Sequence, residues 1–93
     1  MFDITVYEQP KGQRPFDKWF DSLRDKRAQS RIFIKLRQVQ AGSLGDCKSV
    51  GEGILELRID VGAGYRVYCG RFGAELVVLL CGGDKSTQSM TSN

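Results

Sequence analysis

Alternating apolar and polar residues predict strands in the second half of the chain. Residues 55–61 (LELRIDV) are apolar at odd positions and charged at even positions, which is the pattern of a strand with one face on a core. Residues 65–69 (YRVYC) are rich in β-branched and aromatic side chains. Residues 76–81 (LVVLLC) are apolar on both faces, as in a central strand. Because Gly62 and Gly64 can form a tight reversal, the first two strands are predicted to be a hairpin.

The first half of the chain alternates only at its start and then changes to helical spacing. Residues 2–7 (FDITVY) are predicted to form a strand, because they alternate and end before a proline and a glycine. Pro15 fits the first turn of a helix, and a second helix is predicted over residues 26–40, ending before Gly42. The apolar positions of the two helices are Phe16, Trp19, Phe20, Leu23, Ala28, Ile32, Leu36 and Val39.

This order of elements, β-α-α-β-β-β, predicts a fold of the α+β class with two helices packed on one face of a mostly antiparallel sheet. Residues 41–52 have the glycine and polar content of a loop, and residues 86–93 are predicted to be a frayed tail. Residues 1–93 are expected to form a single domain. The sheet face without helices should be open and concave, because sheets twist.

That open face carries charged residues whose positions follow from the hairpin. If the turn centres on Gly62, Arg58 lies opposite Arg66, and Glu56 lies opposite Tyr68. Like charges directly opposed across two strands are destabilising by up to about 1 kcal/mol. A chain with no use for two opposed arginines would tend to avoid them.

The third strand ends in Gly-Gly-Asp-Lys, which can bring Lys85 to the same face. Two arginines and a lysine together would bind an anion, and guanidinium geometry suits phosphate. The alternatives are that the arginines are simply solvated, or that one pairs with Glu56 or Asp60. A one-residue bulge in the turn would also change the register.

Composition limits the chemistry further. The net charge of +3 permits a nucleic-acid partner without requiring one. The second predicted helix contributes much of it through a face that is either solvated or in contact with RNA phosphates or an acidic partner. That face contains Arg27, Arg31, Lys35 and Arg37. The chain has no histidine, which excludes Ser-His-Asp and Cys-His nucleophiles and histidine metal sites.

Cysteine and apolar content indicate neither a disulfide framework nor a membrane protein. The three cysteines lack C-x-x-C spacing, so no zinc site is predicted, and Cys69 and Cys81 are expected to be small buried residues of their strands. No apolar run is long enough to span a bilayer, and the N-terminus begins as a strand instead of a leader. We therefore expect a cytoplasmic protein with no membrane partner.

Two runs of sequence resemble the RelE/ParE toxin superfamily, in particular its HigB-like group of addiction-module killer proteins. They are ELRIDVGAGYRVYC (56–69) and LLCGGDKSTQ (79–88), and FDKWFDSL (16–23) is similar to the first helix of that group. The resemblance implies a RelE-like bacterial type II toxin held inactive by a co-encoded helix-turn-helix antitoxin. HigB-like and RelE-like members cleave messenger RNA in the ribosomal A site, whereas ParE-like members poison DNA gyrase.

For an RNA-cleaving member, the resemblance implies a site on the sheet, with the ribosome and messenger RNA as partners and no metal or small-molecule cofactor. Arg66 matches the arginine of the family's G-Y-R motif, Arg58 the basic residue on the preceding strand, and Lys85 the basic residue after the last strand. The catalytic candidates are Arg66, Lys85, Arg58 and Glu56. The RNA-binding candidates are Tyr68, Arg31, Lys35, Lys48 and Arg71.

The sequence departs from the family at two points. Glu56 stands where RelE has a lysine, and SMTSN stands where many members have a helix with a tyrosine or histidine for proton transfer. Two alternatives to RNA cleavage therefore stay open. One is a ParE-like gyrase poison, whose determinants would lie on the helices and the tail. The other is an inactive relative that only binds antitoxin.

Metal-independent cleavage requires the ribose 2′-hydroxyl to lose a proton, attack the adjacent phosphate and leave a 5′-oxygen that regains a proton. Arg58 and Arg66 stay charged and suit the phosphate, whose negative charge grows in the transition state. The proton steps are assigned to Lys85, then Glu56, with Tyr68 as a further candidate. A lysine crowded by two arginines has its charged form disfavoured and can act as a base.

Overall fold

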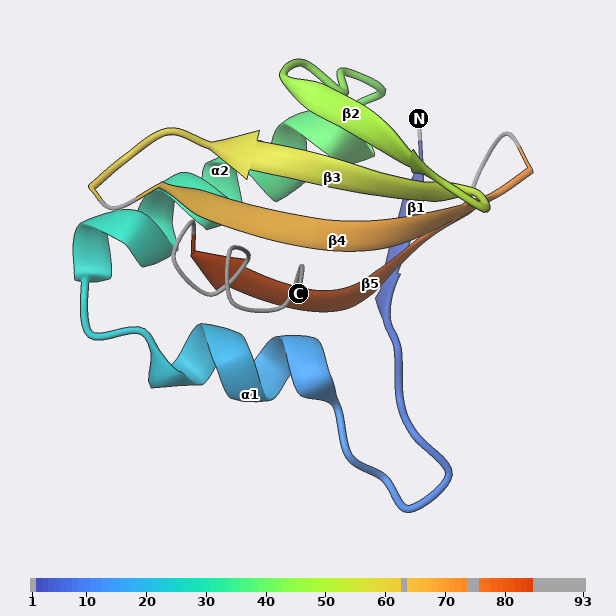
Figure 1. Cartoon of the computed structure of the whole chain (residues 1–93), viewed down its shortest axis with the longest axis horizontal. Helices are drawn as coiled ribbons and strands as arrows, with labels where there is room; N and C mark the ends of the chain where they lie inside the picture. Colours follow the sequence, from blue (N-terminus) through green and yellow to red (C-terminus); the bar gives the residue numbers. More distant parts are fainter. Residues whose placement is uncertain (1, 63, 74–75, 85–93) are drawn as a thin grey trace.

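The computed structural model describes residues 2–62, 64–73 and 76–84, and these form two helices and a five-stranded sheet (Figure 1). The sheet order is β1-β5-β4-β3-β2, with β1 parallel to β5 and all other pairs antiparallel. The predicted α+β class with a mostly antiparallel sheet is confirmed. Lys85 and the predicted tail at 86–93 lie outside the described residues. The elements are β1 (Asp3–Val6), α1 (Pro15–Ser22), α2 (Lys26–Gln40), β2 (Cys47–Gly51), β3 (Ile54–Ile59), β4 (Tyr65–Phe72) and β5 (Leu76–Asp84).

Local signals fix the ends of α2. Asp25 caps its first turn, because the carboxylate accepts hydrogen bonds from the main-chain N–H groups of Arg27 and Ala28 at 3.0 and 3.2 Å. At the other end, Gly42 has a φ of 99° and donates its N–H to the carbonyl of Val39. The predicted bounds of this helix, 26–40, are confirmed.

Both helices pack on one face of the sheet, α1 along β5 and α2 behind β3 (Figure 1). The core between the two layers takes Phe16 from α1 and the predicted stripe from α2, in which Ala28, Ile32 and Val39 are fully buried. The sheet supplies alternate residues of its three central strands. These are Leu57, Ile59, Tyr65, Val67, Cys69, Val77 and Leu79.

The region predicted as a loop at 41–52 contains a strand, β2, and the prediction is wrong there. This strand lies at the edge of the sheet and pairs only with β3 in the part of the chain that the structure describes. Four of its five residues are exposed. Without a buried face the sequence CKSVG has no apolar alternation, so the usual signal of a strand is missing.

A β-bulge in β5 reverses which residues face the helices. Tyr68 pairs with Cys81 and Cys69 with Leu79, so Leu80 has no partner in the register. Beyond the bulge, Gly82 faces the helices and Cys81 is exposed on the other side. The prediction of burial is therefore confirmed for Cys69 and wrong for Cys81.

The glycine at position 82 is required by a close contact between the helix layer and the sheet. A Cβ atom there would lie 2.3 Å from two ring carbons of Trp19 on α1. Carbon atoms pack best at about 3.5–4.0 Å, and Cβ atoms essentially never approach another atom below 3.0 Å. The bulge thus places Gly82 where the Trp19 indole of α1 can pack directly against the backbone of β5.

Candidate functional site

The sheet face opposite the helices, called the polar face below, is built from two cross-strand rows. Glu56, Tyr68 and Cys81 form one row across β3, β4 and β5, and Lys48 of β2 extends it. Arg58, Arg66 and Gly83 form the next row. The predicted pairings of Arg58 with Arg66 and of Glu56 with Tyr68 are confirmed.

Glu56 is the centre of the polar face and is buried, although the sequence predicts it on an open surface. Its side chain is only 4% exposed. One carboxylate oxygen accepts a hydrogen bond from Tyr68 Oη at 3.1 Å, and the other accepts one from Arg58 Nε at 3.3 Å and lies 3.7 Å from Arg66 Nε. The carboxylate therefore neutralises part of the repulsion between the two opposed arginines.

The two arginines retain N–H groups for a further acceptor. Arg66 donates from Nη1 to the carbonyl of Tyr65 at 3.1 Å, while its buried Nε makes no hydrogen bond in the described structure. Arg58 is more open, with 37% of its side chain exposed and Nη1 3.9 Å from the Asp46 carboxylate. Gly83 lies opposite Arg66 and contributes no side chain beside that guanidinium. A phosphate oxygen is the acceptor that this geometry fits best.

Tyr68 is held in its protonated form. Burial raises its pKa above the ordinary 10, and the hydrogen bond to Glu56 and the negative charge of that carboxylate raise it further, while Arg66 acts in the opposite direction. At neutral pH the phenol is therefore a hydrogen-bond and proton donor. It is not a base.

Of the predicted RNA-binding residues, Lys48 and Tyr68 lie on the polar face, and the structure separates Arg71 from them. Arg71 lies opposite Val77, which is fully buried on the helix side, and its guanidinium sits 5.1 Å from the centre of the Phe2 ring. Arg71 and Arg66 therefore point to opposite faces of β4, because they are an odd number of residues apart along the strand.

The prediction that Lys35 lies on an exposed basic face of α2 is wrong. The residue is only 8% exposed, and its Nζ donates hydrogen bonds to the carbonyls of Leu44 and Asp46 at 2.8 and 3.4 Å. The long aliphatic stem is buried while the ammonium group is satisfied by main-chain oxygens. Arg31 remains exposed, as predicted.

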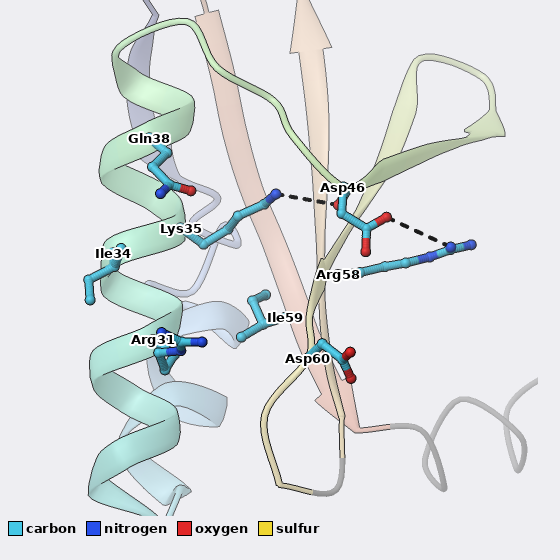
Figure 2. Close-up of a pocket in the computed structure, with 8 residues that line it drawn as sticks. All are labelled: Arg31, Ile34, Lys35, Gln38, Asp46, Arg58, Ile59 and Asp60. Atoms are coloured by element: carbon cyan, nitrogen blue, oxygen red, sulfur yellow. Dashed lines mark hydrogen bonds and ion pairs between the residues drawn. The ribbon is translucent and has the colours of Figure 1, made fainter.

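Lys35 and Arg31 line a cleft of about 290 Å³ between α2 and β3, and Arg58 lies on its opposite side (Figure 2). Asp46 connects the two sides, because its carbonyl accepts from Lys35 and its carboxylate pairs with Arg58. Asp46 was not predicted to be part of the site. It precedes β2 in a stretch without periodicity, and that stretch gives no local signal of where the side chain lies.

Comparison with known proteins identifies the family of the chain. Residues 18–93 match the family described as phage derived protein Gp49-like (DUF891), and the chain belongs to that family. The family is part of the RelE/ParE-like toxin superfamily, so the protein is of the class of type II toxin–antitoxin toxins, which implies an antitoxin partner. An uncharacterized protein of Haemophilus influenzae is 51% identical over 80 residues, which cover 86% of this chain and 81% of that protein. No solved structure matches.

Two negative findings hold for the described residues. None of their helices has the length and apolar content needed to cross a membrane. They also contain no group of three or more cysteine, aspartate or glutamate side chains placed to hold a metal ion.

Proposed function

We propose that this toxin is a HigB-like endoribonuclease that cleaves messenger RNA in the ribosomal A site without a metal ion, and thus acts in the cytoplasm. The observation that carries the proposal is the pair of opposed arginines, Arg58 and Arg66, bridged by the buried carboxylate of Glu56. Guanidinium groups stay charged and bind phosphate through a fixed fork of N–H donors. The toxin class supports the same activity.

The arginines stabilise the phosphate as its negative charge increases. Glu56 fixes their orientation before the RNA arrives, so little reorganisation is needed during the reaction. The N–H groups that do not contact Glu56 face the phosphate oxygens. Loss of one such donor in a preorganised site typically lowers the rate by about 100- to 1000-fold.

The proton steps are divided among neighbouring groups. Lys85, which lies outside the described residues, takes the proton of the 2′-hydroxyl, as predicted from the sequence. Tyr68 donates its phenolic proton to the leaving 5′-oxygen, which is the stronger base. Glu56 is bound to Tyr68 and Arg58, so its part is to position these donors.

The first test is to incubate the purified protein with a defined messenger RNA, with and without programmed ribosomes, and to map the new 5′ ends. We expect cuts within codons that appear only when ribosomes are present. If neither condition gives cuts and the protein instead traps gyrase cleavage complexes, the ParE-like alternative replaces this proposal. Antitoxin binding without either activity would identify an inactive relative.

Two arginines of β4 provide a matched pair of variants. Arg66→Ala should lower the cleavage rate by at least about 100-fold, whereas Arg71→Ala should keep it, because Arg71 lies on the opposite face of the strand. Circular dichroism and urea unfolding establish that each variant is folded. Full activity of Arg66→Ala would contradict the assignment of the site.

A further inference from the structure

The side of α2 that faces away from the sheet carries large apolar side chains in water. Phe33 is 57% exposed and Ile34 is 48% exposed. Neither belongs to the buried stripe of the helix, since both lie on the side of the helix away from Ala28, Ile32 and Val39. We call the surface formed by Lys26, Ser30, Phe33, Ile34 and Arg37 the outer face of α2.

Two shallow hollows lie on either side of Phe33. One is about 390 Å³ and is lined by Phe20, Gln29, Ser30 and Ile34, among others. The other is about 410 Å³ and is lined by Ile4, Leu36, Arg37 and Gln40 as well as by Phe33 itself. Phe33 is thus a ridge between two hollows with apolar walls. Side chains one helical turn apart on a partner helix can occupy both.

The positive charge of α2 indicates which kind of partner the outer face would bind. The sequence of α2, KRAQSRIFIKLRQVQ, contains five cationic residues and no acidic residue. Lys26 lines one hollow and Arg37 the other, with the Arg37 guanidinium 5.9 Å from the centre of the Phe33 ring. A second copy of this chain would bring like charges together at the contact. A partner with carboxylates around apolar side chains is complementary.

We infer that the outer face of α2 binds an acidic amphipathic helix of a partner protein. Identification of that partner with the antitoxin rests on the toxin function proposed above. The acidic, amphipathic character of the partner follows from the surface of α2 alone. Ile34 also lines the cleft that Arg58 closes on its far side, but the two hollows beside Phe33 are lined by neither Arg58 nor Arg66, so a helix seated in them leaves both arginines uncovered. The binding surface and the RNA site are therefore separable by mutation.

The test uses the full-length protein and a fluorescein-labelled 18-residue helical peptide as the probe. The peptide has leucines at i, i+3, i+4 and i+7 and glutamates on both flanks of that stripe. A matched peptide has lysine in place of each glutamate. Binding is followed by fluorescence anisotropy, and hydrogen exchange maps the protected segment.

We expect saturable binding of the acidic peptide with protection of α2, and binding at least about 10-fold weaker for the lysine peptide. The double variant Phe33→Ser/Ile34→Ser should lose at least about 10-fold in affinity, while Lys48→Ala, on the polar face, should keep wild-type affinity. The double variant removes no buried side chain, so it should fold normally and retain RNA cleavage.

Three outcomes would overturn the inference. They are no saturable binding, binding that ignores the double variant, and dimerisation of the protein that the double variant abolishes, which would make a second copy the occupant. Each is independent of whether the protein cleaves RNA. Failure of the nuclease proposal would leave the peptide result unchanged.

Discussion

Replacement of Glu56 by glutamine tests whether the carboxylate holds the two opposed arginines together. Glutamine keeps the shape of the side chain and one acceptor oxygen, so it removes the charge with little change in packing. The Glu56 oxygen lies 3.3 Å from Arg58 Nε and 3.7 Å from Arg66 Nε. We expect Glu56→Gln to destabilise the fold and to leave the arginines repelling each other.

The size of the effect follows from these distances and exposures. At an effective dielectric constant of about 20, each charge pair is worth about 5 kcal/mol before desolvation. Desolvation of a carboxylate that is 4% exposed offsets several kcal/mol of this, and solvent screens Arg58, which is 37% exposed. The net loss in the free energy of unfolding should be about 2–3 kcal/mol, or about 10–20 °C in melting temperature.

Urea unfolding followed by the fluorescence of Trp19, the single tryptophan, measures this loss. In 1 M salt the difference from the wild type should shrink, because the repulsion between the arginines is screened. The double variant Glu56→Gln/Arg58→Gln is the control, and it should be more stable than Glu56→Gln alone. Stability of Glu56→Gln within about 0.5 kcal/mol of the wild type would refute the bridging role.

Three further predictions concern the sheet. Gly82→Ala forces its new methyl against Trp19 and should cost about 1–3 kcal/mol in urea unfolding; an unchanged midpoint would contradict the contact. Because the pKa of Tyr68 is raised on folding, its contribution to stability is complete below pH 10 and is lost as the pH rises through the folded pKa. Tyr68→Phe should therefore flatten the alkaline fall in stability measured by urea titration. Burial raises the pKa of both Cys69, to about 11, and Cys81, but only Cys69 is buried from solvent, so mass spectrometry after alkylation at pH 8 should find Cys81 modified before Cys69; equal rates for these two would exclude this packing.

The sequence was sufficient where a local pattern and the final contacts agree. The period of two in β3, together with a glycine turn, predicted that Arg58 lies opposite Arg66, and the predicted helix over 26–40 has the expected buried stripe. In both elements, the spacing of the apolar residues determines both the type of secondary structure and which side is buried. Periodicity and turn chemistry then contain the needed information.

The sequence was insufficient where tertiary contacts determine the position or the burial of a residue. The edge strand β2 has no buried face, and Cys81 changes sides because of a bulge that no residue of β5 signals. Lys35 is buried because the carbonyls of Leu44 and Asp46 lie within reach of its ammonium group, and the sequence cannot show that proximity. Of the candidate site, the pairing of the two arginines was predicted, whereas the positions of Asp46 and Cys81 were not.

The position of β5 in the sheet has a consequence for how the protein is made. β5 lies between β1 and β4, yet it is the last of the described strands to be synthesised. The hairpin of β3 and β4 can close locally and early, whereas β1 must wait for its parallel partner about 70 residues later, for example Asp3 for Leu76. The Trp19 indole of α1 also has no packing surface until Gly82 of β5 has been added to the sheet. A ribosome that stops before β5 therefore releases a chain without one of the three inner strands of the sheet, so the toxin fold arises only after nearly the whole described chain has been translated.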